Sequence, residues 1–134
     1  MIGRYTVAGQ PSDVEIGGLV QRGFGAVVNV RMPGERMRGE RERVEALGLQ
    51  YIEVPILLET MSGAHATYIR EALAAASPVK VLIHCADGRR AALAAAAMTA
   101  QDEGSGVDGL RLHLSNAGFE PNDAENFIAE YFGA

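Results

Sequence analysis

The segment from Val81 to Ala92 decides the fold, and it reads VLIHCADGRRAA. Its apolar, β-branched beginning predicts a buried strand over Val79–Cys85. A short loop with one glycine follows, and an alanine-rich helix is predicted over Ala91–Gln101. In an open α/β sheet, ligands bind just beyond the carboxyl ends of the strands. The segment therefore predicts a strand, a ligand-binding loop and a helix in direct succession.

The rest of the chain repeats this alternation of strand and helix. Its order predicts an α/β fold in which a mainly parallel central sheet is flanked by helices on both faces. A length of 134 residues suits one domain, over residues 1–134. The other strands are predicted at Tyr5–Ala8, Ala26–Val30 and Gln50–Ile56, and the other helices at Asp13–Arg22, Glu40–Leu47, Ala64–Ala76, Val107–Asn116 and Asn122–Phe132.

Composition and charge narrow the classes of partner. A formal net charge of −5 argues against a nucleic-acid-binding face and against an anionic membrane as partner. No apolar run approaches the ~18–20 residues that a membrane span needs. The first residues, MIGRYT, do not resemble a secretory signal, so we expect a cytoplasmic domain. The sequence leaves the oligomeric state open.

Metal and disulfide chemistry are not expected. The single cysteine excludes an intrachain disulfide and any zinc site with two or four cysteines. His65 and His113 are far apart in sequence and lack the ligand spacing of a metal site. We therefore expect neither a metal nor another cofactor.

Cys85 is the candidate nucleophile. The loop N–H groups and the dipole of the following helix should form an anion cradle that favours thiolate over thiol. Gly88 allows the backbone to turn its amides inward, and Arg90 can place its planar guanidinium against two oxygens of an oxyanion. His84 is expected to hydrogen-bond the loop and to tune the sulfur. The expected substrate-binding set is His84, Ala86, Gly88, Arg89 and Arg31, with Arg89 a solvated charge at the rim and Arg31 a strand-end arginine beside the crevice.

This arrangement resembles the cysteine-dependent phosphatase superfamily, with its His-Cys-x-x-Gly-x-x-Arg-Ser/Thr loop. Cys85 and Arg90 are one residue closer than in the Cys-x₅-Arg loop of tyrosine and dual-specificity phosphatases. The shorter spacing resembles the phosphatase-like domain found beside β-lactamase-like hydrolases, formerly a domain of unknown function. Its opening motif is matched by VAGQP at residues 7–11, and its next stretches by VVNVR at residues 27–31 and by GLQY at residues 48–51. The resemblance runs from about Tyr5 to Ala92, and it implies a protein-tyrosine-phosphatase-like fold.

Two residues depart from the superfamily pattern. Ala91 stands where the superfamily has a serine or threonine that hydrogen-bonds the thiolate and assists turnover. Asp87 adds a carboxylate to a loop that is meant to hold a dianion, and Coulomb repulsion opposes this unless the carboxylate points outward or pairs with an arginine. Both departures predict weak activity, a different anion or no catalysis.

The proton donor for the leaving alcohol has two candidates. Related enzymes carry an aspartate after the strand that precedes the cysteine strand. Glu59 is the only acid of that stretch here, and Asp87 is the other candidate. Between Arg31 and Arg43, acidic residues interleave with the arginines, which predicts a solvated face rather than a polyanion site.

The first functional hypothesis is a weak phosphatase that acts on a phosphorylated small molecule or protein. Cys85 would attack the phosphoester and form a thiophosphate intermediate, which water would hydrolyse. The second hypothesis is a rhodanese-like sulfurtransferase with a Cys85 persulfide, because rhodaneses also use a short strand-to-helix loop. The third is a catalytically inactive anion-binding module, which Asp87 and Ala91 favour.

Overall fold

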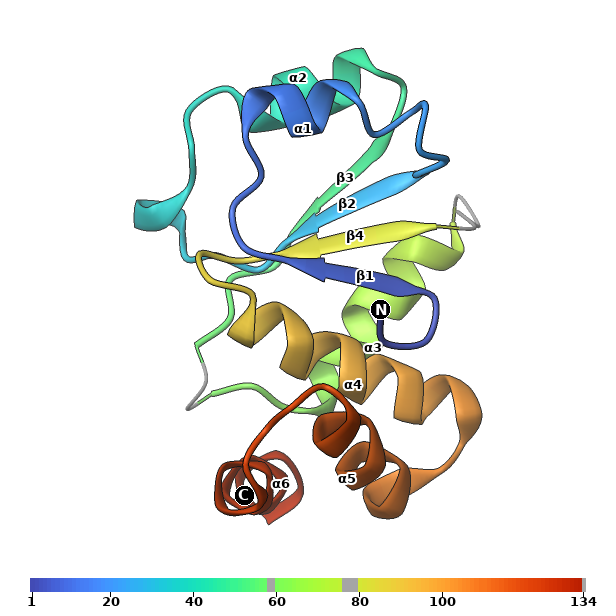
Figure 1. Ribbon diagram of the computed structural model, residues 1–134, viewed down its shortest axis with the longest axis vertical. Coiled ribbons are helices and arrows are strands. Elements are labelled where there is room, and N and C mark those ends of the chain that lie inside the picture. Colours follow the sequence, from blue (N-terminus) through green and yellow to red (C-terminus); the bar gives the residue numbers. More distant parts are fainter. Residues whose placement is uncertain (58–59, 76–79, 134) are drawn as a thin grey trace.

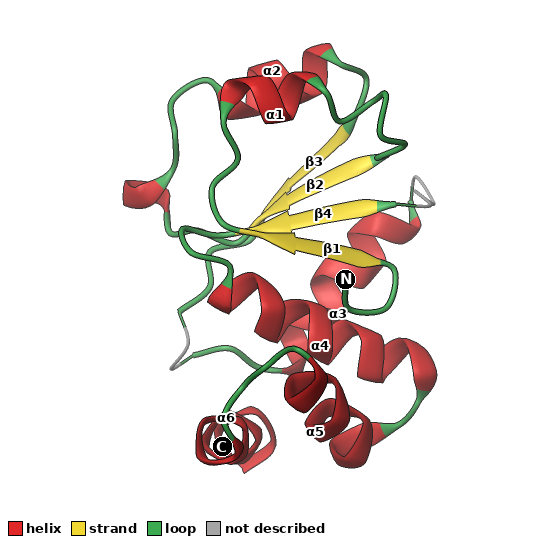
Figure 2. Ribbon diagram, in the orientation of Figure 1, coloured by secondary structure: helices red, strands yellow, loops and turns green. Residues whose placement is uncertain are grey.

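A parallel sheet lies at the centre of the molecule (Figures 1 and 2). The computed structural model describes residues 1–57, 60–75 and 80–133. Within them, β1 (Tyr5–Ala8), β2 (Ala26–Asn29), β3 (Gln50–Glu53) and β4 (Val81–His84) pair in the order β1-β4-β2-β3, and every pairing is parallel. The expected α/β fold with a parallel central sheet is confirmed.

The strands end together at one edge of the sheet. His84, the last residue of β4, lies opposite Ala8 of β1 on one side and opposite Asn29 of β2 on the other. Asn29 in turn pairs with Glu53, the last residue of β3. The loop that follows β4 is therefore flanked by the loops that follow both neighbouring strands, where α/β proteins place their ligands.

Helices cover both faces of the sheet, as the sequence predicted (Figure 2). One face carries α1 (Asp13–Gly17) and α2 (Glu40–Ala46), and the other carries α3 (Gly63–Ala74) and α4 (Arg89–Glu103). The last two helices, α5 (Gly106–Asn116) and α6 (Pro121–Gly133), lie on the outer side of α4 (Figure 1). In the part of the chain that the structure describes, no helix has the length and hydrophobicity to span a membrane.

The alternation of side chains along the strands divides the core in two. Val27 and Leu82 belong to the smaller hydrophobic cluster, whereas Val28 and Ile83 belong to the larger one. The larger cluster contains α4, which buries every residue from Ala91 to Ala100. Its alanines let the helix approach both the sheet and α5 closely, since a small side chain keeps two backbones near each other.

Several predicted boundaries were wrong. The first helix ends at Gly17 rather than Arg22, because two successive glycines weaken it. The third strand ends at Glu53, ahead of Pro55, whose ring removes a ladder hydrogen bond. Helix α4 begins at Arg89 rather than Ala91, because the turn at Gly88 already aligns the next residues. The predicted start of β4 and end of α3 fall partly on residues 76–79, outside the described residues.

Ile69 tests how far stability depends on the larger cluster. Its side chain is fully buried on α3, so Ile69→Ala should lower the free energy of unfolding by about 2–5 kcal/mol. The adjacent Tyr68 is 58% exposed, and Tyr68→Ala should stay within about 0.5 kcal/mol of the wild type. Urea denaturation measures both values. Equal losses in the two variants would contradict this division of α3 into a buried and an exposed face.

Candidate active site

Backbone amides of the loop after β4 converge on the sulfur of Cys85. The N–H of Gly88 donates to Sγ at 3.1 Å and the N–H of Ala91 donates to it at 3.5 Å. Gly88 has φ +93°, a left-handed conformation that glycine adopts without steric cost, and this turns the amides inward. Cys85 itself is fully buried at the start of α4. These donors can stabilise negative charge on the sulfur or on an oxyanion bound beside it.

The end of β1 braces the outer side of the same loop. The N–H of Gln10 donates to the Ala86 carbonyl at 3.2 Å, and the N–H of Cys85 donates to the Ala8 carbonyl at 3.3 Å. A Cβ on Gly9 would come within 2.9 Å of the Ala86 oxygen. The close approach of these two backbones therefore requires glycine at position 9.

Asp87 points to the N-terminus of α4. Its Oδ1 accepts the N–H of Arg89 at 3.0 Å and the S–H of Cys85 at 3.8 Å. The carboxylate therefore pairs with a backbone amide rather than with an arginine side chain. It satisfies the first turn of the helix and places a negative charge beside the sulfur.

Arg90 is held by a carboxylate that the sequence analysis did not single out. Its Nη1 and Nη2 donate to the two oxygens of Glu35 at 2.9 and 2.7 Å, and Nη1 also donates to the Ile56 carbonyl at 3.1 Å. The hydrogen bonds from Arg90, followed by one from the Met32 N–H, lower the pKa of Glu35 to about 2. Two separate loops thus fix the guanidinium of Arg90.

Arg89 turns to the other side of the loop. Its guanidinium lies 5.1 Å from the ring centre of Phe119, and its Nη2 is 3.5 Å from Asp123 Oδ2. It borders a cavity of about 620 Å³, which Gly88, Glu120 and other residues also line. The side chain is about half exposed, as expected for a solvated charge at the rim.

His84 does not contact the loop, contrary to the prediction. Successive strand residues point to opposite faces, so His84 lies on the face of Leu82 and faces α2, whereas Cys85 belongs to the cluster on the other face. The Nε2 of His84 lies 2.7 Å from Glu40 Oε2, and its Nδ1 is buried without a partner among the described residues. Any influence of His84 on the sulfur must therefore pass through the backbone of β4.

Glu40 was expected on a solvated face, but it is 1% exposed. Its Oε2 accepts from Tyr51 Oη at 2.6 Å, from Asn29 Nδ2 at 3.2 Å and from His84, and its Oε1 accepts from Gln10 Nε2 at 2.6 Å. Burial raises the pKa of this carboxyl, but the hydrogen bonds from His84 and Tyr51 outweigh it and lower the pKa to about 2. The interleaved charges concealed this residue, because one buried member of a charged helix leaves no periodic signal.

The remaining predicted site residues, Arg31, Ala86 and Glu59, do not form one group. Arg31 follows β2 and lies beside Gln10, with its Nη1 2.7 Å from Gln10 Oε1. Ala86 is exposed on the loop. Glu59, the first candidate for the general acid, lies outside the described residues. Within residues 1–57, 60–75 and 80–133, no cluster of histidine, cysteine and carboxylate side chains could hold a metal.

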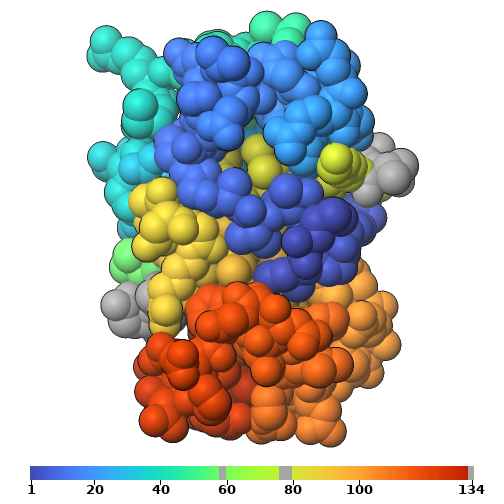
Figure 3. All heavy atoms as spheres, in the orientation of Figure 1, coloured from blue at the N-terminus to red at the C-terminus, as the bar shows by residue number. Residues whose placement is uncertain are grey.

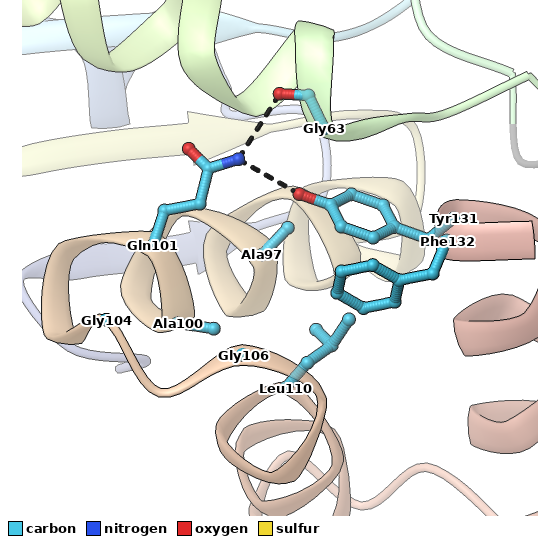
Figure 4. Close-up of a pocket in the computed structure, with 9 residues that line it drawn as sticks. All are labelled: Gly63, Ala97, Ala100, Gln101, Gly104, Gly106, Leu110, Tyr131 and Phe132. Atoms are coloured by element: carbon cyan, nitrogen blue, oxygen red, sulfur yellow. Dashed lines mark hydrogen bonds between the residues drawn. The ribbon is translucent and has the colours of Figure 1, made fainter.

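A second cavity lies at the other end of α4 (Figure 4). It has about 350 Å³ and is lined mainly by glycine, alanine and aromatic residues of α3 to α6. Gln101 spans it, donating to the Gly63 carbonyl at 3.2 Å and to Tyr131 Oη at 3.1 Å. None of the predicted site residues that the structure describes lines this cavity.

Several solved structures with a similar fold are described as phosphatases or phosphatase-like proteins. A DUF442 protein from Shewanella putrefaciens superposes with a TM-score of 0.72 at 18% identity, over 95% of this chain and 85% of its own. TpbA from P. aeruginosa superposes with a TM-score of 0.69 at 19% identity, over 97% of this chain and 80% of its own. A structure of TpbA in complex with pTyr is also known. The core catalytic domain of a PP-IP phosphatase from S. cerevisiae, solved in complex with citrate, superposes with a TM-score of 0.71 at 15% identity. The superposition covers 97% of this chain and 82% of that domain.

The chain has the fold of these phosphatases. The resemblance inferred from the sequence is confirmed at the level of fold. Among curated proteins, the β-lactamase hydrolase-like proteins of two Xylella fastidiosa strains are 29% identical over 93 residues. The match covers 66% of this chain and only 21% of those proteins. No protein-family profile matches the chain.

The buried Glu40 should make folding stability depend on acid pH. Because its pKa is about 2 in the folded protein and 4.5 ordinarily, its contribution is complete above pH 4.5 and is lost as the pH falls toward 2. The loss amounts to at most about 3 kcal/mol. Urea denaturation between pH 2 and 6 should show a weaker pH dependence for Glu40→Gln than for the wild type. Glu42→Gln, an exposed site on the same helix, should follow the wild type, and parallel profiles for all three proteins would contradict the assignment.

Proposed function

We propose that this protein is a cysteine-dependent phosphatase and that Cys85 is its nucleophile. The observation that carries the proposal is the convergence of two backbone N–H groups on Sγ, with Arg90 held in place beside the loop. The fold shared with several phosphatases supports it, and so does the position of the loop at the carboxyl ends of the strands.

The proposed reaction proceeds in two displacements. The Cys85 thiolate attacks phosphorus, the P–O ester bond breaks, and the leaving oxygen takes a proton from a general acid. Water then attacks the phosphorus of the thiophosphate and gives its proton to the group that had acted as general acid. The S–P bond breaks, phosphate leaves and the Cys85 thiolate is restored. The equatorial oxygens would meet the loop amides and Arg90. Three of its five N–H groups bind Glu35 and Ile56, so two remain for an oxyanion as far as the described residues extend.

The substrate class follows from the cradle and from the neighbours. A cradle of amides and arginine suits an oxyanion such as phosphate, and the solved neighbours include one bound to pTyr and one named as a PP-IP phosphatase. We therefore propose a phosphorylated protein or small molecule as substrate. Neither a metal nor another cofactor enters the proposed steps, since nucleophile and cradle are protein groups. A free thiol is kept reduced most readily in a reducing compartment, and this favours the cytoplasm.

Trapping the intermediate tests the function. The wild type should hydrolyse p-nitrophenyl phosphate, and rapid acid quenching should leave a phosphate adduct on the Cys85 peptide in mass spectrometry. Cys85→Ser should abolish turnover and the adduct. If the wild type instead converts thiosulfate and cyanide to thiocyanate and carries a persulfide, it is a sulfurtransferase. If it binds vanadate but turns over neither substrate, it is an inactive anion-binding module.

Asp87 is proposed to be an inhibitory charge in the cradle. Its carboxylate repels a phosphate dianion at a cost on the order of 1–2 kcal/mol, so Asp87→Ser should tighten vanadate binding about tenfold. Serine can still accept the N–H of Arg89, which keeps the helix terminus satisfied. Asp123→Asn, beside Arg89, is the matched control and should leave vanadate affinity close to the wild-type value.

The same variant also identifies the general acid. If Asp87 donates the leaving-group proton, Asp87→Ser will leave vanadate affinity unchanged and will lower the turnover of aryl phosphates, most strongly for poor leaving groups. That outcome would overturn the inhibitory role and would favour Asp87 over Glu59 as the acid.

A further inference from the structure

Arg31 is a cation near the nucleophile loop that forms no salt bridge with a carboxylate within the described part of the chain. Its side chain donates through Nη1 to the amide oxygen of Gln10 at 2.7 Å, which is a neutral partner. Its backbone N–H donates to Asn29 Oδ1 at 2.9 Å, which fixes the turn after β2. Arg90, by contrast, is paired with both oxygens of Glu35. Of the two arginines, Arg31 therefore has the charge left for an incoming anion.

Glu40 determines which end of the Gln10 amide faces Arg31. An ionised carboxylate can only accept hydrogen bonds, so Gln10 must turn its Nε2 toward Glu40 Oε1, at 2.6 Å. The Oε1 of Gln10 then points to the guanidinium of Arg31. With the opposite orientation, an NH₂ group would meet a guanidinium and neither could accept. The charge of Glu40 thus fixes the orientation of the Gln10 amide, and that amide in turn fixes the position of the Arg31 guanidinium.

We call the chain of contacts from Glu40 through Gln10 to Arg31 the relay. Glu40, its first member, is held firmly in place. Three donors from three different strands, Asn29, Tyr51 and His84, hold its Oε2. The carboxylate is 1% exposed, so water does not compete for it. A fully hydrogen-bonded buried carboxylate has few alternative positions, and this restricts Gln10 as well.

The relay ends at the candidate active site. The backbone N–H of Gln10 donates to the carbonyl of Ala86, in the nucleophile loop, at 3.2 Å. Arg31 also acts electrostatically on Glu35, the carboxylate that holds Arg90. Gln10 therefore contacts the nucleophile loop through its backbone and Arg31 through its side chain, so a single residue connects this guanidinium to the loop.

We propose that Arg31 supplies the uncompensated positive charge that binds the phosphate group of the substrate, and that Glu40 is a positioning residue that orients Arg31 through Gln10. This inference rests on the proposed phosphatase function. It assigns the ground-state attraction for the phosphate mainly to Arg31, while Arg90 acts as a structurally held part of the cradle.

Orthovanadate binding by purified full-length protein tests the role of Arg31. A charge-assisted hydrogen bond of this kind predicts that Arg31→Gln weakens vanadate binding about tenfold or more. The KM for p-nitrophenyl phosphate should rise with a smaller change in kcat, as expected for binding shared by substrate and transition state. Arg38→Gln is the matched control, because Arg38 is an exposed arginine of the same loop segment, and it should bind vanadate like the wild type. Equal affinities for Arg31→Gln and Arg38→Gln would overturn the proposal.

A double-mutant cycle tests the role of Glu40. Glu40→Gln frees the Gln10 amide to turn over, so it should weaken vanadate binding several-fold in the wild type and have no further effect in the Arg31→Gln background. A merely structural role would give equal losses in both backgrounds, and that result would refute the positioning role. If Glu40→Gln does not fold, Gln10→Ala takes its place in the cycle, because Gln10 is only half-buried.

The wild-type measurements separate this inference from the proposed function. A wild type that neither binds vanadate nor hydrolyses p-nitrophenyl phosphate would overturn the phosphatase function, and the inference with it. A wild type that does both, with Arg31→Gln indistinguishable from its control, would overturn the inference alone.

Discussion

The buried carboxylate of Glu40, on α2, organises the face of the sheet that packs against this helix. Removing Glu40 from water costs several kcal/mol unless hydrogen bonds replace its hydration, and here four donors replace it. These donors come from β2, β3 and β4 and from the segment after β1. The hydrogen bonds to this one carboxylate therefore fix the three strands relative to one another. The loops that follow these strands are positioned as a result.

The two faces of β4 carry different chemistry at adjacent residues. His84 turns to the polar network around Glu40, and Cys85 turns to the amides at the start of α4. Because the side-chain period of a strand is two residues, the sulfur is separated from the buried carboxylate by the sheet itself. This separation keeps an opposing negative charge away from the nucleophile, while the network still fixes the strand that carries it.

Three arginines around the loop have different partners. Arg90 is paired with Glu35, Arg89 with Asp123 and the ring of Phe119, and Arg31 with the neutral amide of Gln10. Asp87, in the loop just before α4, adds a negative charge next to the sulfur. The affinity of the cradle for an anion thus depends on a small difference between nearby charges, and single substitutions should shift it in either direction.

The sequence by itself determined the parallel α/β fold and the strand–loop–helix around Cys85, because these follow from local hydrophobic periodicity, one glycine and helix propensity. It could not determine that Glu35 binds Arg90 or that Glu40 is buried against His84, because these residues are 55 and 44 positions apart in the chain. A carboxylate among arginines looks solvated until the fold shows which face it lies on. Only the tertiary structure decided these pairings, since they depend on which strand ends the parallel sheet brings together.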